Sequence, residues 1–182
     1  MPTPEEDRRR YYRIADQIAL EILPFGGQPE ESAPLFSLLV ELHQLELESQ
    51  PLLRQISDSN RPLASYLTLQ SRRLELLGQM LAMALLQNPG QPRPVTLSEG
   101  GISFSNPEPL PEQGLFNLKI LLFPETLALL LPARVIYCGP DGQGQYAVGM
   151  EFETPTDTQR QLLARHVLKC QARQLRQTPG EH

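Results

Sequence analysis

Apolar residues recur at two different periods along the chain, and the change of period divides it into segments. From Ile14 to Leu23 the apolar pattern mostly alternates and ends at Pro24-Phe25-Gly26-Gly27, which predicts a strand followed by a turn. From Leu35 onward the apolar positions are three and four residues apart, which predicts helix. They form a heptad stripe: Leu35, Leu38, Leu42, Leu45, Ser49, Leu52 and Ile56.

Pro51 and a polar run divide this helical block into two helices. Proline lacks a backbone N–H and clashes with the preceding turn, so Pro51 is expected to kink or break the first helix. The polar run from Ser57 to Pro62 then ends it. The second helix is expected to begin at Ser59 or Asn60 as N-cap and to stop at Asn88-Pro89-Gly90.

The second helix carries its own apolar stripe, in a register that does not continue the first. Its positions are again three and four residues apart: Leu63, Leu67, Gln70, Leu74, Leu77, Leu81 and Ala84. Leu69, Leu76, Met80 and Met83 lie off this stripe, so the apolar surface is broader than one packing partner requires. We therefore expect this helix to be buried by more than one neighbour.

The alternating pattern returns after Gly90 in short runs that turn signals divide. The runs cover residues 95–97, 101–105, 115–122, 126–131, 133–137 and 146–152. Pro132 is expected to separate two of them, and Pro140-Asp141-Gly142-Gln143-Gly144 forms the best-defined hairpin turn. Short strands without interleaved helices predict an antiparallel barrel or sandwich. A last helix begins at Thr156 or Asp157 as its cap.

Two packing schemes are open for the first two helices. In one scheme, they cover the barrel of their own chain, as amphipathic helices usually do. In the other, copies of the chain associate through the second stripe. We favour association, because about fifty helical residues with two leucine stripes exceed what a small barrel can cover. The expected oligomerisation residues are Leu63, Leu67, Leu74, Leu77 and Leu81.

The distribution of charge narrows the possible functions. The 182 residues carry a net charge of −5, which argues against general nucleic-acid binding, because that normally requires a basic domain. Yet Arg8, Arg9, Arg10 and Arg13 gather within the first thirteen residues. A local basic cluster in an acidic protein favours a specific small anionic ligand.

The sequence offers little sign of catalysis or of a metal centre. Cys138 and Cys170 lie far apart without a CxxC partner, which favours a reduced, cytoplasmic location over a disulfide or metal site. His43, His166 and His182 have no evident partner, and the common catalytic motifs are missing. The N-terminus lacks the apolar segment of a signal peptide, and charge and proline interrupt the most apolar stretch. We expect neither an enzyme nor a membrane protein.

Two motifs resemble those of the PilZ-domain family. Arg9 and Arg13 fill the RxxxR pattern that precedes the first strand in that family. Ser98 and Gly101 fill a second motif, in which Asp or Asn is followed by x-Ser-x-x-Gly. The position of the Asp or Asn holds Thr96 here, so one residue of the motif differs.

The resemblance covers residues 8–24 and 93–153 and implies an α+β fold with a small antiparallel β-barrel. Within a single domain, the helical block 32–89 is then an oligomerisation insertion after the first strand, and residues 155–177 form a C-terminal helix. The chain is similar to an atypical branch of the family that carries heptad helices inside the barrel sequence. That branch implies a homotetramer.

The resemblance also implies a ligand, the bacterial second messenger cyclic di-GMP, with no other cofactor. The implied binding residues are Arg8, Arg9, Arg10, Arg13, Thr96, Ser98, Gly100 and Gly101. Guanidinium groups suit the two phosphates and the guanine O6/N7 edges of this ligand, and paired glycines allow close backbone approach. Thr96 keeps a hydroxyl but lacks carboxylate or amide geometry, which weakens one contact.

Three functions remain in competition. The first is a non-catalytic cyclic di-GMP receptor whose helices pass the signal to protein partners, and this is the one we favour. The second is an interaction scaffold without nucleotide binding, since some members of the tetramer-forming branch lack the arginine motif and residues 97–101 can be a simple turn between strands. The third is a nucleic-acid or acidic-lipid binder, against which the net charge of −5 argues.

Overall fold

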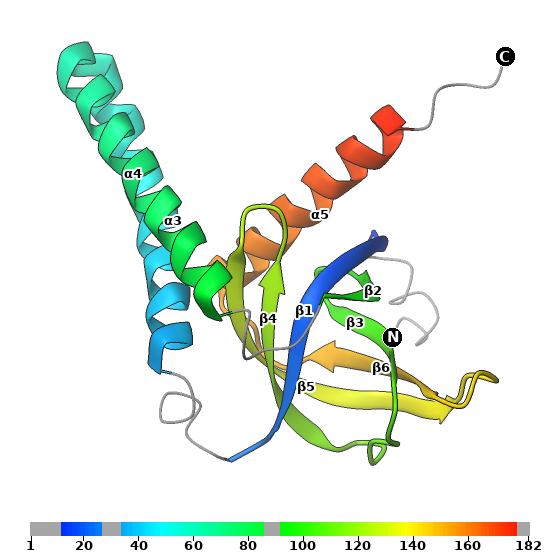
Figure 1. Cartoon of the computed structure of the whole chain (residues 1–182). Coiled ribbons are helices and arrows are strands. Elements are labelled where there is room, and N and C mark those ends of the chain that lie inside the picture. Colours follow the sequence, from blue (N-terminus) through cyan, green and yellow to red (C-terminus); the bar gives the residue numbers. More distant parts are fainter. Residues whose placement is uncertain (1–11, 27–33, 86–91, 178–182) are drawn as a thin grey trace, which may run out of the picture.

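The protein is a closed barrel with three helices in the part of the chain that the computed structural model describes, residues 12–26, 34–85 and 92–177 (Figure 1). Antiparallel strands follow one another around the barrel in the order β1-β2-β3-β6-β5-β4. The strands are β1 (Ile14–Pro24), β2 (Arg93–Leu97), β3 (Gly101–Asn106), β4 (Leu115–Leu122), β5 (Leu127–Pro140) and β6 (Tyr146–Phe152). The helices are α3 (Pro34–Ser59), α4 (Arg61–Leu85) and α5 (Asp157–Gln177).

This architecture confirms the predicted α+β class, with two helices inserted after the first strand and one helix at the C-terminal end. Apolar and polar residues largely alternate in β1, β2 and β3, whereas β4 and the first half of β5 carry nearly continuous buried runs. Their inward side chains, such as Ile18, Leu118 and Val135, are fully buried in one core. Leu163 and Val167 of α5 belong to the same core, so this helix covers one opening of the barrel.

Helices α3 and α4 pack side by side and project away from the barrel as a hairpin (Figure 1). Small residues of α4 allow the close approach: Ala64, Gly78 and Ala82 are buried. A Cβ atom at Gly78 would lie 3.0 Å from Cδ2 of Leu42 in α3. Larger side chains at this position would therefore push the two helices apart.

The base of the hairpin docks on the outside of the barrel through a second apolar cluster. Phe36 and Leu39 of α3 pack there with Ala82 of α4 against the outward-facing side chains of Leu121 and Ala128. Burial of large side chains in this cluster stabilises the docking by roughly 2 kcal/mol per residue. The helices thus partly cover the barrel of their own chain.

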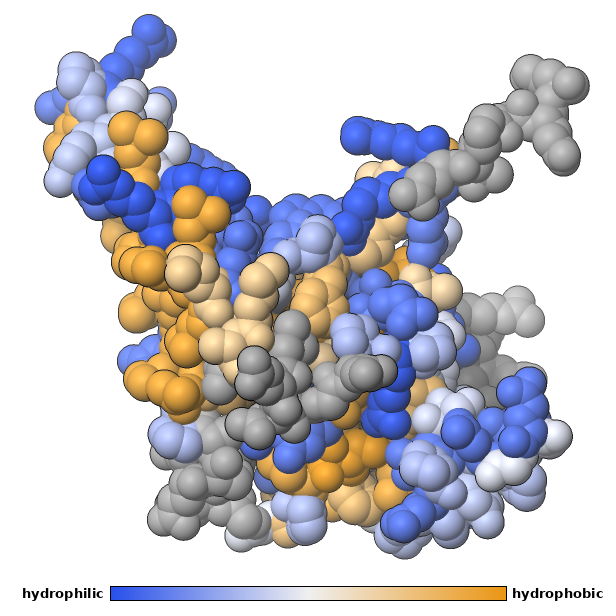
Figure 2. Space-filling view, viewed as in Figure 1, coloured by the Kyte–Doolittle hydropathy of each residue, from blue (hydrophilic) through white to orange (hydrophobic). Residues whose placement is uncertain are grey.

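Away from the face that docks on the barrel, the hairpin exposes an unusual amount of apolar surface (Figure 2). Of the predicted oligomerisation residues, Leu63, Leu74 and Leu77 are 44%, 48% and 60% exposed. Leu67 is half-buried, and Leu81 is half-buried against the docking cluster. The off-stripe residues Leu69, Leu76, Met80 and Met83 are exposed as well.

Two prolines behave differently from the expectations above. Helix α3 continues through Pro51 and ends only at Ser59, so of the predicted kink or break the break is wrong. An interior proline removes a single helical hydrogen bond, and the rest of the helix can continue around it. The next helix, α4, is capped by Asn60, whose Oδ1 accepts from the Leu63 N–H at 3.1 Å. The predicted N-cap is thereby confirmed.

Pro132 does not divide two strands either, because β5 runs unbroken from Leu127 to Pro140. The pairing of β5 with β6 begins only at Ala133, and the Pro132 carbonyl accepts from the Glu153 N–H at 2.8 Å, beyond the end of β6. The nitrogen of Pro132 faces the same neighbouring strand as its carbonyl, at a point where β6 has already ended. The missing N–H therefore removes no hydrogen bond from the β5–β6 ladder. The predicted hairpin turn at 140–144 is confirmed.

The start of α5 is fixed by a capping box, as its sequence predicts. The Gln159 N–H donates to Oγ1 of Thr156 at 3.2 Å, and the Thr156 N–H donates to Oε1 of Gln159 at 3.0 Å. Two backbone donors at the helix start are satisfied reciprocally in this way. The side-chain amide of Gln159 also donates to the Leu130 carbonyl at 3.0 Å, which ties the helix start to β5.

Candidate functional site

The two halves of the predicted ligand site meet at one end of the β1–β2 pair. In the antiparallel register Ile14 faces Leu97 and Ala15 faces Thr96. Arg13 directly precedes this pairing and Ser98 directly follows it. Residues some 85 positions apart in the chain are therefore neighbours across two strands.

The side chains at this end of the pair are directed by strand alternation. Ile14 and Leu97 point into the barrel and are buried. Arg13 and Thr96 lie on the opposite, outward face and are exposed. An exposed arginine at the start of β1 and an exposed threonine on β2 thus lie at the same end of the strand pair.

Ser98 lies in a tight turn whose geometry its own hydroxyl helps to fix. The Ser98 N–H donates to the Gly101 carbonyl at 2.9 Å, and the Gly101 N–H donates to the Ser98 Oγ at 3.1 Å. The Ser98 Oγ also donates to the Gly101 carbonyl at 3.2 Å. A hydroxyl has one donor and two acceptor positions, so only one acceptor position of Ser98 remains for a ligand.

Gly101 is required by the packing of the barrel. A Cβ atom at this position would lie 2.4 Å from the Met150 carbonyl oxygen on β6. The neighbouring Gly100 carbonyl accepts from the Phe152 N–H at 2.9 Å. The glycine pair therefore has a structural role, because it joins the β2–β3 turn to β6.

Arg8, Arg9 and Arg10 precede the first described residue, Tyr12, and so lie outside the described residues. Of the eight predicted ligand residues, the structure describes Arg13, Thr96, Ser98, Gly100 and Gly101. These five surround the open end of the β1–β2 pair.

A match to a known protein family shows to which family this chain belongs. The model of the PilZ domain matches residues 72–169, more than half of the chain. This chain belongs to the PilZ-domain family. The matched PilZ segment begins within α4 and ends within α5, so α3 and the first part of α4 separate it in sequence from β1 and the arginine segment.

A solved structure supports the PilZ assignment over nearly the whole chain. It is a pathogenic protein from Xanthomonas campestris, described as a new tetrameric PilZ domain that self-assembles through an unusual helical bundle. It shares 21% sequence identity with this chain at a TM-score of 0.58, and the match covers 92% of this chain and 90% of that one. At this identity the likeness shows a common fold.

A second structure is more distant from this PilZ chain. The Bacillus subtilis inhibitor of motility (MotI/DgrA) shares 15% identity at a TM-score of 0.46, and the match covers 97% of this chain and 57% of that one. No curated protein matches the sequence significantly. Among the described helices, none has the length together with the apolar character needed to cross a bilayer.

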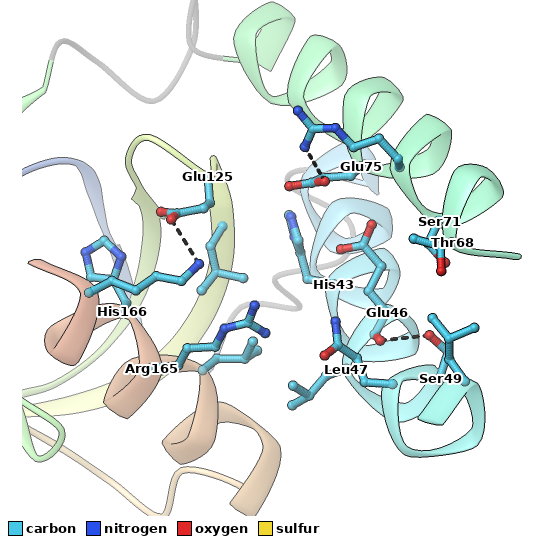
Figure 3. A pocket seen from close by; sticks show the side chains of 16 residues that line it. His43, Glu46, Leu47, Ser49, Thr68, Ser71, Glu75, Glu125, Arg165 and His166 are labelled. Carbon is cyan, nitrogen blue, oxygen red and sulfur yellow. Dashed lines mark hydrogen bonds and ion pairs between the residues drawn. The ribbon is translucent and has the colours of Figure 1, made fainter. Parts of the chain in front are cut away.

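Apart from the PilZ motif residues, the structure contains a cavity of about 330 Å³ between the helical hairpin and α5 (Figure 3). Charged side chains of both signs line it from the two sides, Glu46, Glu75 and Arg72 on the hairpin and Arg165 and Lys169 on α5. Burial raises the pKa of Glu46, and the neighbouring Glu75 raises it further while Arg165 opposes the shift. The opposing charges within the cavity largely compensate one another, so its chemistry favours no particular ligand.

His166, for which the sequence indicated no partner, has a close one in this PilZ barrel. Its Nε2 lies 2.6 Å from Oδ2 of Asp16 on β1. His43, the other described histidine, accepts weakly from the Ala128 N–H at 3.5 Å, and burial lowers its pKa. The only sequence signal for the His166 pair was a carboxylate at an inward position of the first strand, where apolar residues are the rule.

We expect Gly101→Ala to destabilise the protein by about 2 kcal/mol or more, because the new methyl group would collide with the Met150 carbonyl. Gly139→Ala is the matched control, since a Cβ atom there meets nothing within 4 Å. The control should change the free energy of unfolding by less than about 0.5 kcal/mol. Urea denaturation without ligand measures both, and equal stabilities of the two variants would contradict a structural role for Gly101.

Proposed function

We propose that the protein is a non-catalytic cyclic di-GMP receptor that acts in the bacterial cytoplasm and passes the signal through an oligomeric helical assembly. PilZ domains are generally cyclic di-GMP effector modules without catalytic activity. The observation that carries the proposal is the β1–β2 register, which brings Arg13 beside Ser98 and Thr96 on the outer face of the barrel. The ligand is regulatory, and no other cofactor is required.

The chemistry of the arginine segment suits this ligand. Cyclic di-GMP carries two phosphates and two guanines, whose O6 and N7 atoms accept paired hydrogen bonds from a guanidinium. Arg13 is exposed at the start of β1 and can turn toward such a ligand. Arg9, four residues earlier, supplies the second guanidinium of the motif, while Arg8 and Arg10 add phosphate contacts or stacking.

The β2–β3 turn supplies the opposite side of the proposed site. Thr96 presents its hydroxyl on the outer face, and Ser98 retains one acceptor position after its contacts within the turn. Gly100 would let a nucleobase approach the backbone closely, whereas the space beside Gly101 is already occupied by the Met150 carbonyl. A ligand held between this turn and the arginines would order the N-terminal segment against the barrel.

We further propose that the hairpin joins copies of the chain, with a homotetramer as the favoured assembly. Eight large apolar side chains on α4 are more than 40% exposed: Leu63, Tyr66, Leu69, Leu74, Leu76, Leu77, Met80 and Met83. Monomeric proteins rarely expose apolar patches of this extent. The similar fold of the Xanthomonas campestris protein, a tetramer built through a helical bundle, supports this assembly.

A second candidate function is a PilZ scaffold that binds protein partners through the hairpin without nucleotide. It is favoured because two of the three positions of the second motif have a structural role. Ser98 uses its hydroxyl within its own turn, and Gly101 is required by the Met150 carbonyl. Both residues would be retained in such a scaffold, and Thr96 in place of Asp or Asn would be harmless.

Calorimetric titration separates the two candidates. We expect cyclic di-GMP to bind the full chain with a dissociation constant of tens of micromolar or below, and Arg9→Ala or Arg13→Ala to weaken binding at least about tenfold, since each removes a charge-assisted contact. Arg54→Ala, at an exposed position on the hairpin, is the control and should bind like the unmodified chain. Absence of binding heat, or unchanged affinity in both motif variants, favours the scaffold.

Thr96→Asp is expected to strengthen cyclic di-GMP binding by roughly tenfold, because a carboxylate accepts charge-assisted hydrogen bonds that a hydroxyl cannot match. Thr96 is exposed, so the change should leave the free energy of unfolding within about 0.5 kcal/mol of its original value. Ser103→Asp, on the strand position that pairs with Thr96, is the control for a general effect of added negative charge. Weaker binding in Thr96→Asp, or an equal gain in the control, would contradict the assigned position of the ligand.

Leu77→Asp is expected to break the assembly into smaller species, because it places a charge in the apolar surface that copies of the chain would share. Leu77 is 60% exposed, so the folded monomer should tolerate the change. Leu168→Asp, 62% exposed on α5, is the matched control and should leave the mass unchanged. Light scattering at micromolar concentration reads the mass, and a monomeric unmodified chain would rule out the proposed association.

A further inference from the structure

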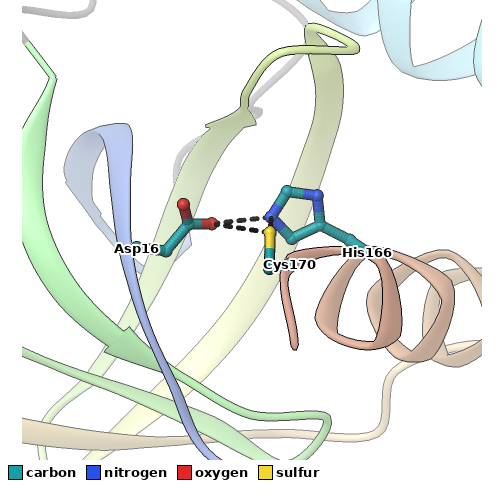
Figure 4. Close-up of side chains that lie close together, drawn as sticks. All are labelled: Asp16, His166 and Cys170. Atoms are coloured by element: carbon teal, nitrogen blue, oxygen red, sulfur yellow. Dashed lines mark hydrogen bonds and ion pairs between the residues drawn. The ribbon is translucent and has the colours of Figure 1, made fainter. Parts of the chain in front are cut away.

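Three side chains with metal-binding chemistry converge where β1 meets α5 (Figure 4). Asp16 extends from β1, and His166 and Cys170 extend from α5 one helical turn apart. The His166 Nε2 lies 2.6 Å from the Asp16 Oδ2 and 3.3 Å from the Cys170 Sγ. The Cys170 Sγ lies 3.9 Å from the same Asp16 oxygen. The three ligand atoms thus form a small triangle.

The triangle is not the arrangement of a catalytic relay. A nucleophile, a base and an orienting carboxylate use both nitrogens of the histidine, one toward each partner. Here the same atom, Nε2 of His166, is the one nearest to both Asp16 and Cys170. Three donor atoms that face one common point are instead the arrangement in which side chains share a single ion.

We propose that Asp16, His166 and Cys170 form a zinc-binding site. In a tetrahedral zinc site, with bonds of about 2.0 to 2.3 Å, ligand atoms lie about 3.3 to 3.8 Å apart. The His166–Cys170 separation of 3.3 Å lies within this range and the Cys170–Asp16 separation of 3.9 Å lies just above it. The His166–Asp16 separation of 2.6 Å would have to open by roughly 0.7 Å to admit the ion. A thiolate, an imidazole and a carboxylate together suit zinc, whereas magnesium and calcium take oxygen ligands.

The burial of the cluster fits a metal ligated by three side chains and a water molecule. The side chain of His166 is 2% exposed and Cys170 is buried, but the side chain of Asp16 is 14% exposed. Solvent therefore reaches the cluster from the Asp16 side and can occupy the fourth position. Binding converts the Cys170 thiol to a thiolate, and its proton passes to solvent.

Two neighbouring groups support the ligands. The Arg173 Nη2–H donates to the Cys170 Sγ at 2.9 Å, which favours a thiolate. Glu125 and His166 line the same cavity and interact electrostatically. The Glu125 Oε2 is buried and has no hydrogen-bond partner within residues 12–26, 34–85 and 92–177.

Without a metal, the same environment keeps the cysteine neutral. Burial raises the pKa of the Cys170 thiol, and the charge of Asp16 raises it further, while Arg173 opposes both. A divalent cation would reverse the effect of Asp16 by pairing with its charge. The bound ion would also link β1 to α5 and hold the helix over the end of the barrel.

Cobalt titration of the full, reduced chain tests the site, because a thiolate bound to Co²⁺ gives a charge-transfer band in the near ultraviolet. The band is expected in the unmodified chain and in Cys138→Ser, in which Cys170 is the only thiol left. Cys170→Ser should abolish the band, and His166→Gln should weaken metal binding at least about tenfold. Elemental analysis after zinc loading should give one ion per chain.

Zinc should also raise the melting temperature of the unmodified chain, by roughly 5 °C at a hundredfold excess over its dissociation constant. The Cys138→Ser result decides the question even if Cys170→Ser fails to fold. No charge-transfer band in Cys138→Ser at 100-micromolar-scale cobalt (about tenfold over a ~10 µM site) would overturn the proposal. Undiminished metal binding in folded Cys170→Ser and His166→Gln would overturn it too, and the cluster would be a hydrogen-bonded clamp only.

Discussion

Closure of the barrel by β1 is the constraint on which the other features of the molecule depend. This strand pairs with β2 on one side and with β4 on the other, although the helical hairpin and more than sixty residues separate it from both. Such non-local pairing must overcome a large loop-closure entropy. The hairpin reduces this cost, because its base packs on the barrel beside β1.

Each face and end of β1 is used for a different purpose. Its inward residues, Ile14 and Ile18, complete the barrel core, and the outward Ala19 belongs to the cluster on which the hairpin docks. Arg13 at its start lies beside the β2–β3 turn. Asp16, inward but polar, reaches the histidine of α5. A single strand therefore brings together the candidate ligand surface, the helical insertion and the C-terminal helix.

Local patterns predicted the elements well because most of them are decided by their own residues. The capping residues Asn60 and Thr156 and the turn at 140–144 begin and end elements through contacts within a few positions. The breaks predicted at Pro51 and Pro132 are not observed, because whether a proline interrupts an element depends on its surroundings. At Pro132 the decisive fact is that β6 has already ended, which no local pattern contains.

The candidate site was predictable only in part, for the same reason. The resemblance identified Ser98 and Gly101, but not that both are already committed to the turn and to the contact with β6. The pairing of Asp16 with His166 joins positions 150 apart, and it follows from barrel closure together with the placement of α5. A polar residue on the inward side of a strand predicts that a polar partner exists, but it does not predict which residue the partner is.

The position of Asp16 near the start of β1 provides a physical connection between the arginine segment and α5. Arg13 and Asp16 are three residues apart on β1, and between them Ala15 accepts through its carbonyl from the Gln174 side chain of α5 at 2.8 Å. A ligand bound at Arg13 would therefore act on a strand that is held to α5 by both contacts. Because packed elements shift as units and do not deform continuously, a displacement of β1 would be felt at α5. The hairpin, docked on the same strand through Ala19, would be affected too.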